Sequence, residues 1–150
     1  MKQEDKELLL KDLCARFVYH PFIYGKSGYA TNDGTLTGVF TSGVHIMTGG
    51  GSVHHYFIEE VKPYLRPMQS MTNEEREEYR KLCKKVVRKM YVSDGTSVLL
   101  NKKLYRYFGT KTEYYDTYQS IDYLISRHFD YRGLIGKKLA LKATKGMYEI

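Results

Sequence analysis

Residues 43–58 read GVHIMTGGGSVHHYFI, and this stretch decides the class of fold. Two short runs rich in β-branched and aromatic residues flank three consecutive glycines, a pattern typical of a β-hairpin. A two-residue turn at Gly49-Gly50 would place Thr48 opposite Gly51. In that register one face holds Val44, Ile46, Val53 and Phe57, and the other holds His45, Met47, His54 and Tyr56. Because the first face is wholly apolar, as a half-buried sheet requires, we expect this register.

The residues around the hairpin extend the β pattern in both directions. We expect strands near 16–24, 35–41, 43–48 and 53–58, with turns at 32–34 and 42–43. The run at 61–67 contains prolines, which cannot donate a hydrogen bond to a sheet, so it should form an edge or closing strand. Short strands at this density predict a small antiparallel β-barrel or curled sheet, SH3-like in type, over residues 16–67.

Two helices are predicted on either side of the β-rich part. Residues 3–15 place Leu9, Leu10, Leu13 and Cys14 at helical spacing. Thr72 and Glu75 have the spacing of a capping box, so a long amphipathic helix is expected over 73–90. Its apolar stripe follows the i, i+3, i+4 rule through Tyr79, Leu82, Cys83, Val86, Val87 and Met90.

The rest of the chain is predicted to hold an excursion, a helix and a tail. Residues 91–116 form a variable excursion, within which 96–108 reads equally as a hairpin or as irregular structure. Residues 117–150 hold the C-terminal helical segment and tail, with Ser120 as the helix cap. The inward side chains should be Ile121, Leu124, Ile125 and His128 or Phe129, with Leu139 and Leu141 docking the tail. The expected fold class is α+β, built as one domain over 1–150.

Composition excludes several classes of protein. The 150 residues are 42% hydrophobic and 27% charged, which is ordinary for a globular domain and excludes a wholly disordered chain. No apolar run approaches the length of a membrane span. Cys14 and Cys83 sit in apolar helical patterns, so we expect core thiols in a reducing compartment. Residues 1–16 do not resemble a secretory signal, and a cytoplasmic location is expected.

Charge is distributed unevenly along the chain. Residues 1–75 carry 7 basic and 9 acidic residues, whereas residues 76–150 carry 17 basic and 8 acidic ones. The stretch 80–111 contains one acid, Asp94. Clustered like charge repels itself, so it usually has a partner or faces solvent. This asymmetry is the strongest functional signal in the sequence.

A basic and aromatic surface in 80–111 is therefore the candidate binding site. On the expected helix the basic residues avoid the apolar stripe, and their spacing would let several meet a phosphate backbone. In an extended run at 102–108, tyrosines and an arginine would alternate between faces, which suits base stacking combined with phosphate contact. The candidate nucleic-acid-binding residues are Arg80, Lys81, Lys84, Lys85, Arg88, Lys89, Lys102, Lys103, Tyr105, Arg106 and Tyr107. The alternative is a solvated charged face with tyrosines at the rim of the core.

Other motifs favour structural roles. A phosphate-binding loop needs a helix after its glycines, but a strand-like run follows Gly49–Gly51. His45 and His54, opposed in the expected register, lack the further ligands that a zinc site needs. His128, Asp130 and Arg132 have a spacing that favours local capping over an acid–base cluster. We therefore expect no metal, no cofactor and no enzymatic activity.

Three stretches carry a resemblance to a known family. They are residues 12–16 (DLCAR), residues 60–75 (EVKPYLRPMQSMTNEE) and residues 128–135 (HFDYRGLI). Together they resemble a family of small uncharacterised proteins of gut Bacteroidales and their prophages or other mobile elements. The resemblance implies no assigned activity or site residue. The stretches are proline-bounded, helix-capping and aromatic, which is typical of residues that determine a fold.

Two functions from different classes follow from these patterns. The first is a non-enzymatic accessory or binding protein that contacts nucleic acid, another polyanion or an acidic protein through 80–111. The second is a protein–protein interaction module, an inhibitor or adaptor, that uses the exposed sheet face and its tyrosines. The two differ in salt dependence, because phosphate binding weakens steeply with salt.

Overall fold

The computed structural model describes residues 1–100 and 103–148, which divide into two compact units. Unit 1 comprises Met1–Thr72 and Asp122–Ile150, and unit 2 comprises Asn73–Ile121. The fold is of the mixed α+β class, with a six-stranded sheet in unit 1 and a two-stranded sheet in unit 2. That the two units form one domain over residues 1–150 remains a prediction. Among the described residues, no helix is both long and apolar enough to cross a membrane.

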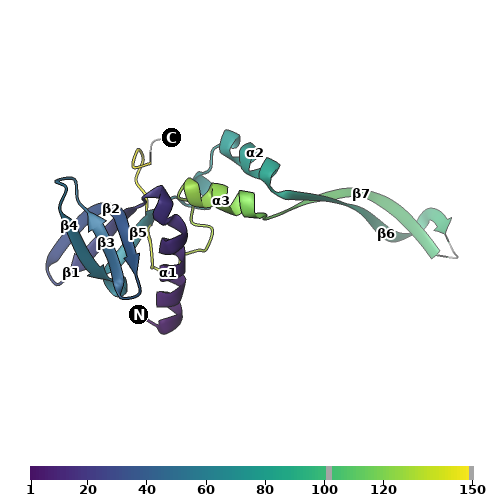
Figure 1. Ribbon diagram of the computed structural model, residues 1–150. Coiled ribbons are helices and arrows are strands. Elements are labelled where there is room, and N and C mark those ends of the chain that lie inside the picture. The colour runs from purple at the N-terminus through teal and green to yellow at the C-terminus, as the bar shows by residue number, and fades with distance from the viewer. Residues whose placement is uncertain (101–102, 149–150) are drawn as a thin grey trace. The chain divides into compact units, whose positions relative to one another are not determined.

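Unit 1 contains a curled sheet with helix α1 beside it (Figure 1). The sheet has the order β4-β3-β2-β1-β5-β8, in which neighbours are antiparallel except the parallel pair β5 and β8. Its elements are α1 (Gln3–Arg16), β1 (Phe22–Ser27), β2 (Ala30–Phe40), β3 (Gly43–Met47), β4 (Val53–Phe57), β5 (Val61–Leu65) and β8 (Leu141–Lys142). In the described part of the chain β4 pairs only with β3, and β8 only with β5. The sheet is therefore open, and the barrel alternative is wrong.

The first strand differs from the prediction. Residues 16–24 were expected to be extended, but Arg16 ends α1 and Phe17–Tyr19 form a 3-10 turn. The turn after β1 lies at Gly28, which adopts φ 60°, and residues 32–34 belong to β2. Gly34 suits a strand here because a Cβ on it would meet the Met47 carbonyl and lie 2.5 Å from an Ile46 methyl. Gly34 therefore marks a place where two strands pack closely, and not a turn.

The predicted strands at 35–41, 43–48 and 53–58 are confirmed, but their hairpin register is wrong. His45 pairs with His55 and Ile46 with His54, one residue away from the expected register. The turn is longer than two residues: the Thr48 N–H donates to the Ser52 carbonyl (2.9 Å), and Gly51 has φ 81°. A shift of one residue exchanges the faces of β4. Tyr56 is therefore buried, and Phe57, predicted inward, is exposed.

Strand β5 lies inside the strand order and not at an edge. It pairs with β1 through Val61–Pro63 and with β8 through Tyr64 and Leu65. The tail after Leu134 docks as predicted, since Leu139 is 5% exposed and Leu141 begins β8. Because β8 pairs only beyond Pro63, the missing proline N–H costs no pairing with β8.

The core of unit 1 contains a buried ion pair that the apolar pattern could not reveal. Asp12 and Arg16, one turn apart on α1, are both fully buried. The Arg16 guanidinium donates to both Asp12 oxygens (2.7 and 3.2 Å) and to the Phe129 carbonyl (2.8 Å). Arg132 approaches Asp12 from the other side (Nε–Oδ1 3.2 Å). The prediction that Cys14 is a core residue is wrong: Asp12 and Arg16 occupy the buried side of α1, and Cys14 is exposed.

The segment 128–135 is held by backbone contacts to Arg66, the residue after β5, and by the carboxylate of Asp130. The Arg66 N–H donates to the His128 carbonyl, and the Asp130 N–H donates to the Arg66 carbonyl (2.8 Å each). The Asp130 carboxylate accepts from the N–H groups of Leu134 and Ile135 (2.7 and 2.9 Å). These contacts agree with the capping role expected for Asp130.

Tyr148 fills a gap in the sheet. The pairing of Ile23 with Pro63 would place Phe22 opposite Tyr64, yet these two residues do not pair directly. The Tyr148 hydroxyl lies between them, accepting from the Phe22 N–H (2.9 Å) and donating to the Tyr64 carbonyl (2.8 Å). Its ring stacks on the buried His128 ring, with centroids 3.9 Å apart. One side chain thus replaces a backbone rung between β1 and β5.

In unit 2 the predicted helix over 73–90 ends early. Helix α2 (Asn73–Leu82) begins directly after Thr72, as expected, but β6 (Lys84–Leu100) follows and pairs with β7 (Lys103–Tyr115). Extending α2 would place like charges four residues apart, as in Lys84 and Arg88, and β-branched Val86 and Val87 favour strands. Of the two alternatives for residues 96–108, the hairpin is confirmed, and it belongs to a longer strand pair that begins at Lys84.

The last helix begins two residues before its predicted cap. Helix α3 (Tyr118–Ser126) follows Thr117, whose Oγ1 accepts from the Ser120 N–H (3.1 Å). The Ser120 Oγ in turn accepts from the Thr117 N–H (2.8 Å). Thr117 therefore caps α3, and Ser120 is its reciprocal partner. The inward prediction is confirmed for four side chains: Leu124, Ile125, His128 and Phe129 are buried.

Candidate nucleic-acid interface

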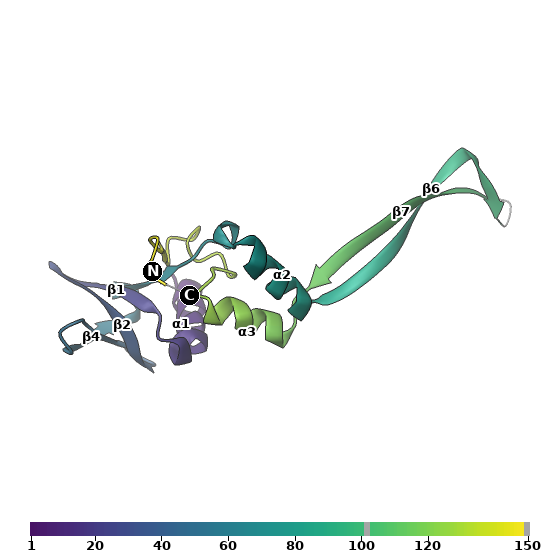
Figure 2. The same ribbon diagram turned by 90° about the horizontal axis from the view of Figure 1, so that it is seen from above.

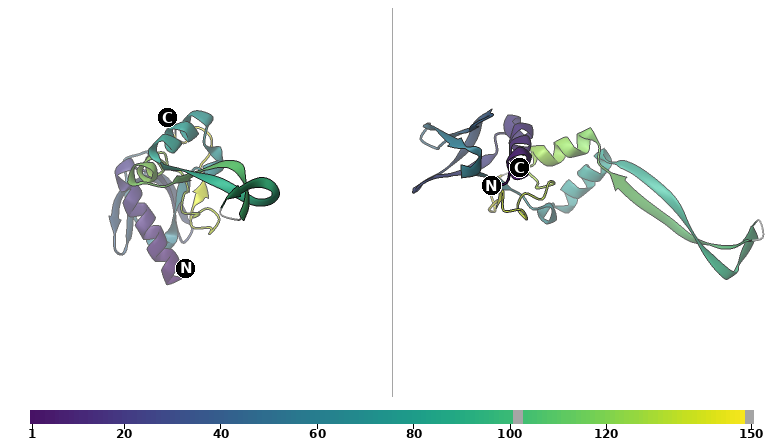
Figure 3. Two further views of the ribbon diagram at one scale, coloured as in Figure 1. Left: turned by 90° about the vertical axis from the view of Figure 1, so that its right-hand side faces the viewer. Right: turned by 90° about the horizontal axis from the view of Figure 1, so that it is seen from below.

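Strands β6 and β7 form a twisted two-stranded ribbon (Figure 2). Pairing runs from Lys84 opposite Tyr115 to Leu100 opposite Lys103, with irregularities after Met90 and after Ser93. A second pair of views shows the two strands winding about each other (Figure 3). Among the described residues, no third strand pairs with the ribbon, so both of its edges lack a neighbouring strand there.

The structure places the predicted site residues on a strand pair, with two on the preceding helix. Arg80 and Lys81 lie in the last turn of α2, and Lys102 lies outside the described residues. Strand β6 carries Lys84, Lys85, Arg88 and Lys89, and β7 carries Lys103, Tyr105, Arg106 and Tyr107. The second set was assigned on the condition of an extended backbone, and the structure shows that backbone from Lys103 onward. The helical placement of the first set is wrong beyond Lys81.

One face at the base of the ribbon gathers cations around a carboxylate. Lys84 and Arg88 alternate with Val86 along β6, opposite Tyr115 and Lys111 of β7. The Glu113 carboxylate lies 3.3 Å from the Arg88 Nε and 3.4 Å from the Lys111 Nζ. It also accepts a hydrogen bond from the Tyr115 hydroxyl (2.5 Å).

Contacts within this cluster shift the pKa values of Glu113 and Tyr115 in opposite directions. The Tyr115 hydrogen bond, with the charges of Arg88 and Lys111, lowers the pKa of Glu113. The same hydrogen bond raises the pKa of Tyr115. Glu113 therefore stays ionised and offsets part of the positive charge on this face.

The opposite face combines a cation with exposed apolar and aromatic groups. Lys85 is exposed, Val87 is 55% exposed and Tyr114 is 45% exposed. The Arg80 guanidinium of α2 lies 5.7 Å from the centre of the Tyr114 ring. The two faces together thus offer cations for phosphate and rings for stacking.

Side chains near Cys83 fix the start of the ribbon. The Thr117 hydroxyl donates to the Leu82 carbonyl (2.6 Å), which satisfies a free acceptor at the end of α2. The Tyr79 hydroxyl donates to the Asp116 carboxylate. Burial of the hydroxyl raises the pKa of Tyr79 most, and the hydrogen bond to Asp116 raises it further. The end of α2 is therefore tied to the chain that leaves β7.

Sequence reasoning missed three members of this surface. Lys111 was counted in the basic run but not assigned to the site, and Glu113 and Tyr115 were not assigned at all. Only the pairing of β6 with β7 brings these residues beside Arg88, because they lie 25 or so positions away in the chain. A correct hairpin prediction for 84–115 would have identified them.

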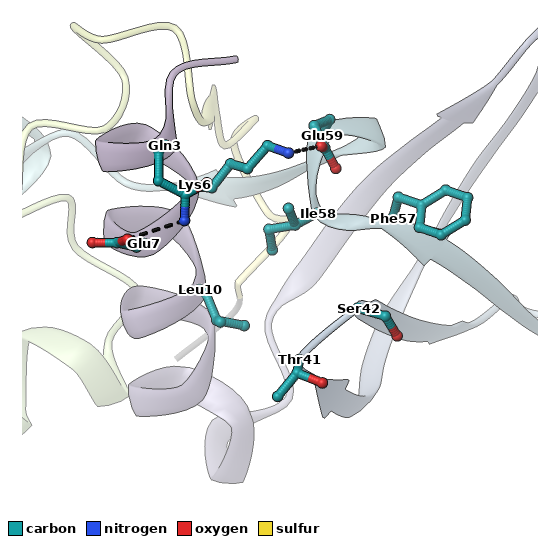
Figure 4. A pocket seen from close by; sticks show the side chains of 9 residues that line it. All are labelled: Gln3, Lys6, Glu7, Leu10, Thr41, Ser42, Phe57, Ile58 and Glu59. Carbon is teal, nitrogen blue, oxygen red and sulfur yellow. Dashed lines mark hydrogen bonds and ion pairs between the residues drawn. The ribbon is translucent and has the colours of Figure 1, made fainter.

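A pocket of about 380 Å³ lies in unit 1, between α1 and the ends of the strands (Figure 4). Leu10 and Ile58 line it from opposite elements, and Thr41 and Ser42 bound it at the turn after β2. The Lys6 ammonium pairs with Glu59 at its rim. Lys6 also lowers the pKa of Glu59 by its hydrogen bond. The pocket lining holds one cation, Lys6, and two carboxylates, Glu7 and Glu59, so it offers less to an anionic ligand than the ribbon does.

The histidines of β3 and β4 do not complete a metal site. His45 lies opposite His55, with ring centroids 5.3 Å apart, and His54 faces away from both. Among the side chains that the structure describes, in residues 1–88 and 111–148, no three from His, Cys, Asp or Glu gather as metal ligands would.

Comparisons with protein-family models, with curated proteins and with solved structures find no match to this chain.

Proposed function

We propose that this protein binds nucleic acid through the β6–β7 ribbon. The observation that carries the proposal is the concentration of charge: residues 84–115 hold eight of the basic residues and two acidic ones, Asp94 and Glu113. That segment alone accounts for +6 of the net +7. A chain that places most of its net charge on one strand pair is suited to a polyanionic partner.

The shape of the ribbon favours nucleic acid over an acidic protein. The major groove of B-DNA admits a two-stranded β-ribbon, and cations on both strands of a ribbon could reach the phosphates on both sides of the groove. Exposed tyrosines such as Tyr114 could stack on unpaired bases.

The test is fluorescence anisotropy with labelled single- and double-stranded DNA and RNA, at low and near-physiological salt. We expect affinity to fall steeply with salt, with a slope that reports about 0.9 per phosphate contact on duplex DNA. The quadruple variant Lys84→Glu, Lys85→Glu, Arg88→Glu and Lys89→Glu should lose binding at both salt concentrations.

A matched control separates a local site from net charge. The variant Lys26→Glu, Lys137→Glu and Lys145→Glu reverses three exposed lysines of unit 1. It should retain most of the affinity, whereas Lys84→Glu, Lys85→Glu and Arg88→Glu, with the same change of charge, should not. Equal losses in the two triple variants, or no binding by the wild type at low salt, would contradict the proposal.

Glu113 provides a variant that should gain affinity. Replacing Glu113 with Gln removes the carboxylate that pairs with Arg88 and Lys111. Both cations would then be available to phosphate, so we expect tighter binding and a salt slope steeper by about 1 to 2. Unchanged affinity would show that these cations do not contact the nucleic acid.

A second candidate function rests on the outer face of the curled sheet. Phe40, Met47, Val53 and Phe57 are each between 41% and 56% exposed there, and β3 and β4 contain no charged residue. This surface suits an inhibitor or adaptor that binds another protein, with only mild salt dependence. Pull-down with a Phe40→Ser, Phe57→Ser variant as control distinguishes it from ribbon-mediated binding.

We place the protein, within the same proposal, among non-enzymatic accessory proteins of mobile-element origin that act in the cytoplasm. The resemblance to the Bacteroidales family supports the origin. The curled, largely antiparallel sheet supports an SH3-like relationship for unit 1. Purification of the protein with bound nucleic acid from its native cytoplasm would support the location.

A further inference from the structure

Strand β4 leaves backbone hydrogen-bonding groups unpaired at one edge of the sheet. Antiparallel strands bond through alternate residue pairs. The bond from the Thr48 N–H to the Ser52 carbonyl fixes this alternation, so His54 and Tyr56 bond to β3. The N–H and carbonyl groups of Val53, His55 and Phe57 therefore point away from the sheet.

Glu60 confirms this orientation. Its carboxylate accepts a hydrogen bond from the Phe57 N–H at 3.0 Å, which is possible only if that N–H points away from β3. In the described part of the chain, the corresponding groups of Val53 and His55 have no such partner. Glu60 thus covers one end of the edge and leaves its middle available.

The two edges of the sheet are protected differently. The edge at β8 is two residues long and carries the exposed Lys142, and short, charged edges resist pairing. Strand β4 reads VHHYF, with no charge, no proline and no bulge in its pairing with β3. The β4 side chains on the outer face of the sheet are exposed, Val53 to 55% and Phe57 to 56%.

We propose that β4 pairs antiparallel with β4 of a second copy of this chain, about a twofold axis at His55. This register aligns outward-pointing backbone groups: His55 meets His55 of the copy, and Val53 meets Phe57. The Val53 N–H can donate to the Phe57 carbonyl of the copy while Glu60 keeps the Phe57 N–H. An isologous contact requires a surface that matches itself, and here apolar meets apolar at both ends.

The charge distribution makes this edge the surface at which a second copy is repelled least. Two chains of net charge +7 repel each other on average, and the repulsion is weakest at a surface that carries no charge. Strands β3 and β4 form such a surface. The ring contacts of Phe40 with His45 (4.6 Å) and of His55 with Phe57 (5.8 Å) would continue across the twofold axis as one uncharged face.

Sedimentation equilibrium of nuclease-treated protein tests the association. Over a hundredfold range of concentration, we expect the apparent mass to rise from 17.5 kDa toward twice that value. His55→Lys places like charges at the axis and should weaken association at least tenfold. Tyr29→Lys adds the same charge at a fully exposed turn and should leave it unchanged. Glu60→Ala frees the Phe57 N–H and should strengthen association.

A disulfide tests the register. Residues directly opposite in a hydrogen-bonded antiparallel pair have Cα atoms about 5.5 Å apart, which suits a disulfide. In a Cys14→Ser, Cys83→Ser background, His55→Cys should form a cross-linked dimer on mild oxidation, and Tyr29→Cys should not.

A wild type that stays monomeric throughout the range would overturn the proposal. So would His55→Lys, folded by circular dichroism, that associates as strongly as the wild type. If His55→Lys does not fold, Val53→Lys takes its place, and the cysteine pair remains decisive. Equal cross-linking by both cysteine variants would show random collision and contradict the twofold register.

Discussion

The buried pair of Asp12 and Arg16 is the residue-scale feature on which unit 1 depends. Neither side chain contacts solvent, and Arg16 reaches the Phe129 carbonyl far along the chain. Desolvated charges are tolerated only when each has partners, and here Asp12 also faces Arg132. The pair thus links α1 to the segment 128–135.

Replacing Asp12 with Ala should destabilise the protein by about 3–5 kcal/mol, because it leaves a buried guanidinium without its carboxylate. Urea unfolding followed by circular dichroism measures the change. Cys14→Ala, at an exposed position of the same helix, should change the free energy of unfolding by less than about 0.5 kcal/mol. Similar values for the two variants would contradict the role assigned to Asp12.

His128 makes stability depend on pH. Burial, aided by the charges of Arg16 and Arg66, lowers its pKa to about 4 from an ordinary value of 6.5. Between these values the unfolded state binds more protons than the folded state, so stability falls as the pH falls from about 6.5 to 4. We expect a loss on the order of 2–3 kcal/mol across this window from His128.

Urea unfolding at pH 7 and at pH 4.5, with wild type and His128→Gln, measures this contribution. The variant should be less stable at pH 7 but should lose less stability than the wild type between the two pH values. An equal loss in both proteins would assign the pH dependence to other groups.

At the scale of elements, Thr117 joins the end of α2 to the start of α3. Its hydroxyl donates to the Leu82 carbonyl and accepts from the Ser120 N–H. Thr117→Val should therefore cost about 1–2 kcal/mol, as loss of a helix cap does. Thr117→Ser keeps the hydroxyl and should retain most of the stability in the same urea titration. A cost for Thr117→Ser as large as that for Thr117→Val would contradict the role assigned to the hydroxyl.

The elements also show what could be predicted from the sequence and why. Strands β3 and β4 follow from β-branched runs around Gly49–Gly51, but three glycines allow more than one turn length, and the register came out one residue wrong. The stripe from Tyr79 to Met90 fits a helix, yet the pairing partner that makes a strand of its second half lies at residues 109–115. Long-range pairing of this kind leaves no local signal.

The candidate site was predicted by residue type but not by arrangement. Charge counting identifies Lys84, Lys85 and Arg88, and it does so whatever structure they adopt. Glu113 and Tyr115 join them only through the pairing of β6 with β7. The buried Asp12 was missed because a carboxylate in a charged helix is ordinarily read as exposed.

At the scale of the whole molecule, the two units differ in how they are stabilised. Unit 1 buries a continuous apolar cluster that includes Leu9, Leu13, Ile23, Leu36 and Ile46. The described base of the ribbon in unit 2 exposes its side chains, including Val87 and Tyr114. Elements with few buried contacts open locally at low cost in free energy.

Amide hydrogen exchange should therefore separate the units. We expect the amides of β2 and β3 to exchange through global unfolding, and those of β6 and β7 to exchange at least tenfold faster through local opening. Binding of an oligonucleotide should slow amide exchange in β6 and β7 and leave exchange in unit 1 unchanged. Equal protection of β3 and β6 in the free protein would contradict this difference.

The Tyr148 rung has a consequence for the order of events during synthesis. Strands β1 and β5 are made early, but the side chain that joins Phe22 to Tyr64 emerges only after all of unit 2 has been translated. At 5–20 residues per second, the stretch from Thr72 to Leu134 takes about 3–12 s to translate. During that interval Leu9 and Leu13 lack two of their core partners, Leu134 and Leu139. The nascent sheet therefore exposes apolar surface for several seconds before its core can close.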